Sequence, residues 1–542
     1  MKKLLGALSA GGLVMAVPAV AASPVVETPA GTVEGKTVGK IREFKGIPFA
    51  RPPVGELRWK APLPLPAWEG VRKAQSFGAA CVQPRPNAVH IYANPPAKIS
   101  EDCLTLNIWA PEKAKDAPVI VWIHGGALST GYSHEAMYDG AKLAARGAII
   151  VSINYRLGVL GYMAHPALSA ESADGVSGNY GLLDQIAALE WVKANIGAFG
   201  GDANNVTIAG ESAGALSVMY LMASPKARGL FHKAIAQSAY MISTPSLKEV
   251  RHGEPAAEAT GEKVAAALGA ADIAALRALD PVALTDGAAR AGYFPWGTVD
   301  GKILPDQLVD IFDRGEQAPV PMIAGFNIGE IRSLRILAPP PPANAAAYET
   351  AIRERYGDLA DAWLKLYPAK DLGEAVLAAP RDALYGWTSE RLAIRQTALG
   401  QSAYLYLFDH GYPAASDAGL HGFHAAEIPY VFGTASDTPP YWPKIPDSVG
   451  ERRFAAAMGD YWVSFARTGK PEAAGQAPWR LYGTEAAFMA FADVPRPGTR
   501  LMPGMYALHE AAVCRRRAAG NQPWNWNTGI VSPVLAKGPA CP

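Results

Sequence analysis

One stretch of the chain, positions 206–215, constrains the fold more than any other. Residues 206–209 form a short apolar run rich in β-branched side chains, which is typical of a buried strand. Residues 215–222 are apolar over a greater length and suit a buried helix. The pattern Gly-x-Ser-x-Gly, centred on Ser212, stands between them. The sequence therefore predicts a sharp strand-to-helix turn with a serine at its apex.

This turn would give Ser212 a chemical role. Glycine at positions Gly210 and Gly214 removes the Cβ atoms that would clash in so tight a bend. The bend lifts the Ser212 hydroxyl out of the sheet, and it leaves the N–H of Ala213 at the start of the helix, where it can donate to an oxyanion. Because 54 of the 542 residues are glycine, the pattern alone is weak evidence. A nucleophilic serine also needs partners elsewhere in the chain.

Apolar runs and helical segments alternate along the rest of the chain, which is 49% hydrophobic and can bury a large core. Strands are expected at 104–109, 118–123, 148–155, 234–238, 321–325 and 403–408, after an opening antiparallel ribbon at 31–35 and 41–48. Helices are expected at 179–196, within 246–289, and at 345–356, 381–398 and 451–468. The alternation predicts an α/β fold with a large, mostly parallel central sheet flanked by helices. Two helical insertions in one sheet fit better than separate domains, so residues 23–542 are expected to form a single domain.

The loop at 124–127 is the first candidate partner of Ser212. Its sequence, His-Gly-Gly-Ala, directly follows the buried strand expected at 118–123. Glycines at this point let backbone N–H groups turn toward the site, so the loop can supply further donors to an oxyanion.

A histidine after Ser212 should serve as the base. The histidines available there are His232, His252, His410, His421, His424 and His509. Three of them lie in a glycine-rich loop just after the strand expected at 403–408, where a loop reaches the C-terminal edge of a parallel sheet. Of these we take His424 as the base, with His421 as its rival.

The acid that orients the base should lie between Ser212 and His424 in the sequence. Glu330 follows the strand expected at 321–325 and is our choice. Asp300 and Asp306 also fall in this interval, and by mechanism alone they compete with it.

The N-terminus has the pattern of an export signal. Lys2 and Lys3 precede an apolar run at 4–20, and small residues at 19–22 end it in an Ala-x-Ala cleavage pattern. We expect residues 1–22 to be a signal peptide and the mature protein to be secreted or periplasmic. No later stretch approaches the length needed to cross a bilayer, so no membrane attachment is expected after cleavage.

The charge and the cysteines of the chain bear on its partners and on its crosslinks. The net charge is +1, and no basic run interleaved with aromatic residues suggests nucleic-acid binding. Export permits disulfides, and the four cysteines fall into two pairs along the chain, so we expect Cys81–Cys103 and Cys514–Cys541. A monomer is expected.

Several motifs together resemble the type-B carboxylesterases, the carboxylesterase/cholinesterase group that includes the bacterial para-nitrobenzyl esterases. The resemblance runs from about residue 25 to 510. The motifs are those at 44–48, 101–108, 122–127, 154–158, 178–185, 199–214 and 424–432.

The resemblance implies an α/β-hydrolase domain with its site in a deep gorge. It also implies a serine carboxylic-ester hydrolase that acts on small-molecule esters through an acyl-enzyme, with no metal and no cofactor. The matched positions make Ser212 the nucleophile, His424 the base and Glu330 the acid, and they place the oxyanion hole at the N–H groups of Gly126, Ala127 and Ala213. The Cys81–Cys103 pair matches the first disulfide loop of the family.

The chain also departs from the family pattern. The usual residues around the acid are replaced, because Gly329 and Ile331 flank Glu330. Within the first disulfide loop Tyr92 is the only aromatic residue, where cholinesterases use a tryptophan for the quaternary amine, so choline esters are not expected as substrates. Two alternatives stay open: hydrolysis of an amide, thioester or lactone by the same machinery, and a cholinesterase-like binding protein without catalysis.

Overall fold

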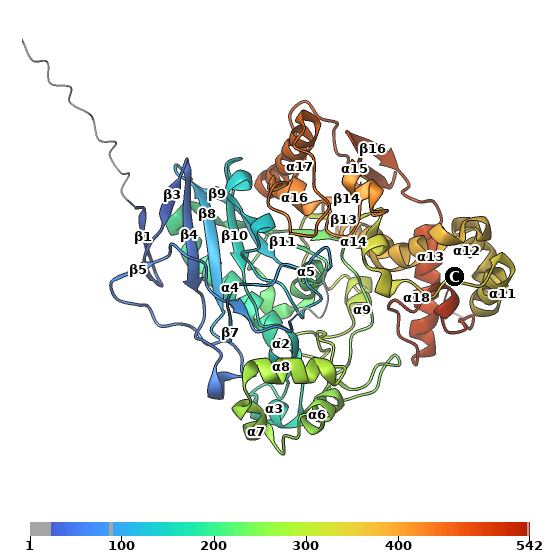
Figure 1. The fold of residues 1–542 in the computed structure, drawn as a ribbon, viewed down its shortest axis with the longest axis horizontal. Helices are drawn as coiled ribbons and strands as arrows, with labels where there is room; N and C mark the ends of the chain where they lie inside the picture. Colours follow the sequence, from blue (N-terminus) through green and yellow to red (C-terminus); the bar gives the residue numbers. More distant parts are fainter. Residues whose placement is uncertain (1–22, 86–89, 539–540, 542) are drawn as a thin grey trace, which may run out of the picture.

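The computed structural model describes residues 23–85, 90–538 and 541. Its central feature is an eleven-stranded sheet of order β16-β15-β14-β13-β12-β11-β9-β10-β8-β4-β3 (Figure 1). The inner strands from β15 to β10 pair in parallel, whereas the outer pairs on both sides are antiparallel. The strands are β3 (Lys36–Val38), β4 (Ile41–Pro48), β8 (Thr105–Pro111), β9 (Ala117–Ile123), β10 (Ile149–Ile153), β11 (Gly201–Glu211), β12 (Lys233–Gln237), β13 (Met322–Asn327), β14 (Ala403–Phe408), β15 (Ala487–Phe491) and β16 (Pro495–Thr499).

Both faces of the sheet are covered, as the continuous apolar runs of its inner strands predict. Every residue of β9 is buried. Successive side chains of a strand point to opposite faces, and β9 accordingly divides between two hydrophobic clusters. Val119, Val121 and Ile123 pack in the cluster that includes residues of α4 (Tyr180–Asn195) and α5 (Ala213–Ala223). Ile120 and Trp122 pack in the cluster that includes α17 (Val449–Thr468).

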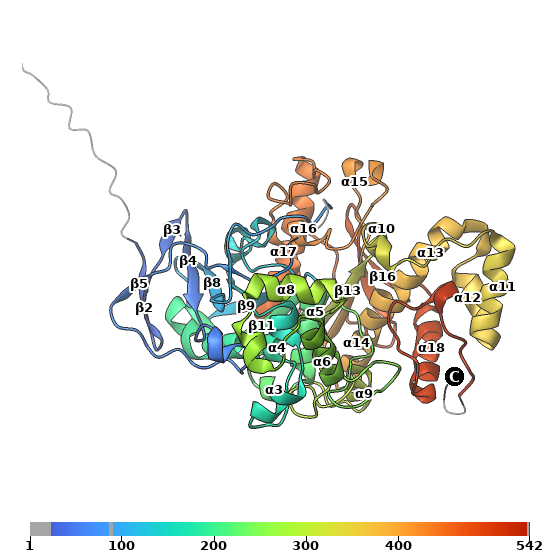
Figure 2. The ribbon, with the colours of Figure 1, turned by 60° about the horizontal axis from the view of Figure 1, so that its bottom comes forward.

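Two groups of helices lie outside these layers and form smaller cores of their own (Figures 1 and 2). One group gathers α6 (Ala257–Ala267), α7 (Ile273–Ala278) and α8 (Pro281–Arg290) beside α3 (Pro166–Glu171). The other gathers α11 (Ala345–Tyr356), α12 (Ala360–Leu366), α13 (Leu372–Arg381) and α18 (Met505–Ala519), near the C-terminus. Helices α6, α7 and α8 correspond to the helical insertion predicted within 246–289, and α11 matches the helix predicted at 345–356, whereas α3, α12, α13 and α18 were not predicted.

Only the opening ribbon differs in pairing from its prediction. β2 (Gly31–Glu34) pairs with β1 (Val25–Thr28) and β5 (Val71–Lys73) in a separate small sheet, whereas β4 joins the main sheet. In the main sheet β4 pairs with β8 on one side and, on the other, with β3, a strand that was not predicted. Gly39, with φ of +60°, closes the tight turn between β3 and β4 that makes this pairing possible.

Residues 1–22, where we predict the signal peptide, lie outside the described part of the chain. Among the described residues, no helix combines the length and the apolar character needed to cross a membrane.

Candidate active site

Ser212 lies at the turn between β11 and α5, in a backbone conformation that few residues adopt. Its φ is 56° and its ψ is −121°. The turn is crowded: a Cβ at Gly214 would lie 2.1 Å from the carbonyl oxygen of Ile123, and one at Gly210 would lie 2.5 Å from the carbonyl carbon of Gly214. Glycine at both positions is therefore a steric requirement of this turn, as the sequence predicts.

The loop after β9 runs beside this turn. A Cβ at Gly125 would lie 3.3 Å from the Cβ of Ser212, so the two segments are in contact. Gly126 and Ala127 both have positive φ, of 103° and 55°. Within the described part of the chain, no acceptor takes the N–H of either residue. The N–H of Ala213 belongs to the first turn of α5, where backbone donors have no partner inside the helix.

His424 and Glu330 are in direct contact. Nδ1 of His424 is hydrogen-bonded to Oε2 of Glu330. Glu330 is completely buried, and its other oxygen accepts from the N–H of Asn327 at 2.8 Å and from Oγ of Ser238 at 2.6 Å. The carboxylate is thus fixed by two donors on one side and presents its free oxygen to the imidazole.

The opposite edge of the imidazole faces Glu211, the residue before Ser212. Nε2 of His424 lies 3.0 Å from Oε1 of Glu211, although the two atoms are not aligned as a hydrogen bond. The Glu211 carboxylate also lies against Gly125, since a Cβ at that glycine would be 3.0 Å from Oε2. These contacts bring Nε2 of His424 into the immediate surroundings of the Ser212 turn. Burial raises the pKa of Glu211 well above its ordinary value.

A third buried carboxyl group, that of Glu427, completes the polar layer beneath the site. It accepts from Nε2 of Gln237 at 2.8 Å and from Nδ2 of Asn327 at 2.6 Å. Asn327 therefore joins two carboxylates, because its backbone N–H binds Glu330 and its side chain binds Glu427. Burial raises the pKa of Glu427.

The carboxylates control the basicity of the histidine. Burial by itself lowers the pKa of His424, but the nearby charges of Glu211 and Glu330 and the hydrogen bond to Glu330 outweigh it and raise that pKa to about 9. A protonated imidazole is therefore strongly stabilised at this position.

Ser212 and His424 line one large cavity, of about 1080 Å³. Described residues on both arms of the first disulfide loop, among them Gln83 and Pro95, line this cavity, and one residue of the loop also contacts the histidine. The hydroxyl of Tyr92 donates to the carbonyl oxygen of His424 at 2.9 Å, and it lies within hydrogen-bond distance, 2.7 Å, of the Ser333 hydroxyl. The loop, the histidine and the segment after Glu330 are thereby joined.

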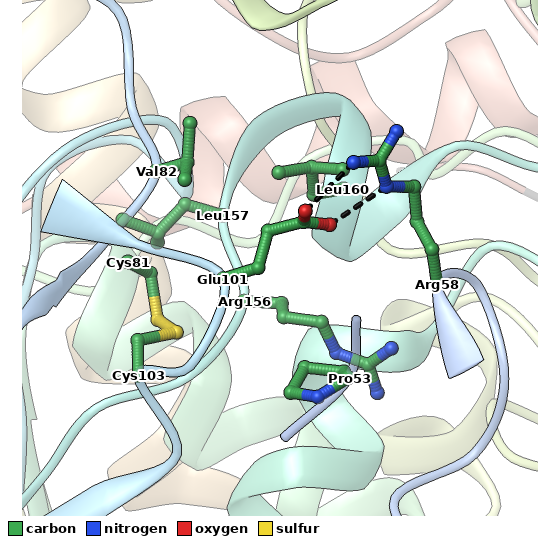
Figure 3. Close-up of a pocket in the computed structure, with 9 residues that line it drawn as sticks. All are labelled: Pro53, Arg58, Cys81, Val82, Glu101, Cys103, Arg156, Leu157 and Leu160. Atoms are coloured by element: carbon green, nitrogen blue, oxygen red, sulfur yellow. Dashed lines mark hydrogen bonds and ion pairs between the residues drawn. A yellow bond between two sulfur atoms is a disulfide. The ribbon is translucent and has the colours of Figure 1, made fainter. Parts of the chain in front are cut away.

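One disulfide and one ion pair fix this loop at its base (Figure 3). The structure contains the Cys81–Cys103 disulfide, and it also contains the predicted Cys514–Cys541 pair. Glu101 accepts from Nε and Nη2 of Arg58, each at 2.7 Å, in a mostly buried bidentate pair. The loop is therefore anchored at its base.

The competing residues Asp300, Asp306 and His421 are bound to partners other than the catalytic candidates. The Asp300 carboxylate accepts from Asn179 and from the backbone N–H groups of its own turn. Asp306 accepts from Nη1 of Arg314 at 3.1 Å. His421 is bound to Asp409 at 3.0 Å, and its side chain is 44% exposed.

Several residues of this site had no role assigned from the sequence. Glu211 and Glu427 lie inside the motifs at 199–214 and 424–432, but the motifs do not say what these side chains contact. Asn327 and Ser238 contact Glu330 or Glu427 only because their strands are neighbours in the sheet. Tyr92 was visible as the only aromatic residue of the disulfide loop, but its hydrogen bond to His424 links positions 332 residues apart.

Comparisons with known proteins agree with this geometry. The sequence profile of the Carboxylesterase family matches residues 22–498. This chain belongs to the carboxylesterase family. A fumonisin B1 esterase of Sphingopyxis macrogoltabida is 36% identical over 479 residues, which is 86% of each chain. The para-nitrobenzyl esterase of Bacillus subtilis (strain 168) is 35% identical over 82% of this chain and 90% of its own length.

Solved structures extend the likeness to three dimensions. A PNB esterase structure matches with a TM-score of 0.77 at 30% identity, covering 89% of this chain and 99% of its own. The fold is that of the α/β hydrolases, and this carboxylesterase family member is a carboxylic ester hydrolase.

Proposed function

We propose that this carboxylesterase hydrolyses esters through an acyl-enzyme on Ser212, with His424 as general base and Glu330 as the group that orients it. The observation that carries the proposal is the His424–Glu330 hydrogen bond beside the cavity that Ser212 also lines. Glu330 fixes the imidazole with its proton on Nδ1, which leaves Nε2 free to accept a proton.

In the first half of the reaction, Nε2 of His424 takes the Ser212 proton as Oγ attacks the ester carbonyl. The negative charge that forms on the carbonyl oxygen is stabilised by the N–H groups of Gly126, Ala127 and Ala213. This role is supported by the N–H groups of Gly126 and Ala127, which donate to no acceptor among the described residues. The imidazolium then gives its proton to the departing alcohol.

In the second half, water attacks the acyl group. His424 takes a proton from the water and returns it to Ser212 as the acid is released. The carboxylates of Glu211 and Glu330 favour the imidazolium that forms in each half, as the raised pKa of His424 indicates.

We further propose that residues 1–22 are removed on export and that residues 23–542 act as one domain in a secreted or periplasmic enzyme. The two disulfides support an oxidising compartment. Sequencing the N-terminus of protein recovered from the culture or periplasm tests this part, and an intact residue 1 would contradict it.

Replacement of the nucleophile tests the mechanism. Ser212→Ala should lower kcat by several orders of magnitude without changing the folded structure, and an organophosphonate should label wild-type protein stoichiometrically at Ser212. Labelling at another serine, or a Ser212→Ala variant with wild-type turnover, would contradict the proposal. Comparing turnover of ester, amide, thioester and lactone substrates decides between ester hydrolysis and hydrolysis of the other three bonds. No turnover of any of these substrates would favour a binding protein without catalysis.

A further inference from the structure

The C-terminal segment beyond the family match contributes a side chain to the substrate cavity. The match ends at residue 498, yet Trp526 lines the same cavity as Ser212 and His424. There it joins Phe294 and Trp296, from the loop that follows α8, in an aromatic cluster. The ring centroids of Trp296 and Trp526 are 5.5 Å apart, those of Phe294 and Trp296 are 4.8 Å apart, and those of Phe294 and Trp526 are 6.4 Å apart.

A dense set of contacts holds Trp526 in position. Arg516, which is 4% exposed, donates to the side-chain and main-chain oxygens of Asn527, both at 2.7 Å, and to Oγ of Ser532 at 2.8 Å. On the other side Trp524 is buried, and its carbonyl oxygen accepts from the N–H of Ser243 at 3.1 Å. Trp526 thus sits between two anchored neighbours, so its ring is preorganised.

The end of this segment is closed covalently. Cys541 is bound to Cys514 on α18, so the whole stretch that carries Trp526 is a closed loop based on that helix. Ordering of this kind is present before any ligand arrives, which reduces the entropy lost on binding.

The chemistry of the cluster selects an apolar ligand. Phe294 is 47% exposed, and Trp296 and Trp526 are only partly buried, so their aromatic rings remain accessible in the cavity that Ser212 and His424 also line. All three are neutral aromatic side chains. Such surfaces bind flat apolar groups by offset and edge-to-face contacts.

We propose that Phe294, Trp296 and Trp526 form a specificity subsite for the bulky, flat apolar group of the ester, and that the C-terminal segment exists in part to supply Trp526. This inference rests on the proposed function, because the ester bond must lie at Ser212 while the apolar group lies on the cluster.

The test measures the preference of the enzyme for an ester with a large aromatic group over one with a small group. The substrates are two matched pairs: 2-naphthyl acetate with ethyl acetate, which differ in the alcohol, and methyl 2-naphthoate with methyl acetate, which differ in the acyl group. The ratio of kcat/KM within each pair is compared between variant and wild type, so that the intrinsic reactivities of the esters cancel. Trp526→Ala should reduce at least one ratio by about ten- to hundredfold, whereas Trp526→Phe should retain most of it.

The control is Val534→Ala, in the same segment but 63% exposed and outside the cavity, which should keep both wild-type ratios. Phe294→Ala should reduce the same ratio as Trp526→Ala, and it offers an independent variant if Trp526→Ala does not fold. Equal loss on the large and small esters, or unchanged ratios in both alanine variants, would overturn the subsite. Ser212→Ala in the same assay separates the two proposals. If Ser212→Ala keeps wild-type turnover, the proposed function fails. If it is inactive while Trp526→Ala and Phe294→Ala keep both ratios, only the subsite fails.

Discussion

Replacing Glu330 by glutamine tests how His424, the proposed general base, is held. The carboxylate oxygen that accepts from Asn327 and Ser238 has two donors at 2.8 Å and 2.6 Å. In the variant the amide oxygen must take this place, because an NH₂ group there would face the N–H of Asn327. The NH₂ group therefore turns toward Nδ1 of His424 and donates to it, which puts the imidazole proton on Nε2. In that tautomer His424 cannot accept the proton of Ser212.

The size of the effect follows from these contacts. Flipping the amide to restore the productive tautomer leaves the N–H of Asn327 without an acceptor, which costs about 1–3 kcal/mol. The charge-assisted hydrogen bond that stabilises the imidazolium is lost as well, at about 1.5–3 kcal/mol. The sum, about 2.5–6 kcal/mol, includes the ~4–5.5 kcal/mol that corresponds to a 10³–10⁴-fold fall in kcat. We therefore expect a fall of that order.

The assay is steady-state hydrolysis of an activated ester, with the melting temperature as the measure of folding. Ser238→Ala is the graded control: it removes one of the two donors that fix Glu330 but leaves the charge, so kcat should fall by less than about tenfold. Asp300→Asn and Asp306→Asn should keep kcat near wild type, because both aspartates have partners elsewhere. A Glu330→Gln enzyme within tenfold of wild-type kcat, or a collapse in either asparagine variant, would refute the reasoning.

Three further predictions concern pH dependence and stability. The kcat/KM should rise with pH as His424, with a pKa of about 9, loses its proton. Glu211→Gln removes a charge that raises this pKa, so the midpoint of the rise should move to lower pH. An unmoved midpoint would contradict the electrostatic coupling between Glu211 and His424. Gly214→Ala brings a Cβ within 2.1 Å of a carbonyl oxygen, so it should lower the free energy of unfolding, measured by urea titration, by about 1–3 kcal/mol. A variant as stable as the wild type would show that the turn can relax. Serine at both Cys81 and Cys103 opens a loop whose ends are 22 residues apart and should cost about 3 kcal/mol in the same titration; no loss would mean that other contacts hold the loop.

The sequence by itself determined the features that depend on neighbouring residues. Strand β14 and helix α11 match their predicted limits, because an unbroken apolar run and helical spacing are local properties. The turn at Ser212 is also local: its backbone requires glycine two residues before and two residues after, and this requirement is written in the chain.

Tertiary structure decided the features that depend on distant segments. By mechanism alone the sequence offered Glu330, Asp300 and Asp306 as candidates for the acid. The tertiary structure shows that Glu330, just after β13, contacts His424, whereas Asp300 and Asp306 lie between β12 and β13 and have other partners. The position of Trp526 in the cavity rests on a buried arginine and a disulfide, and no periodicity reveals either contact. Local sequence thus determined the backbone conformation of the Ser212 turn, whereas contacts between segments distant in the chain determined which side chains surround His424 and line the cavity.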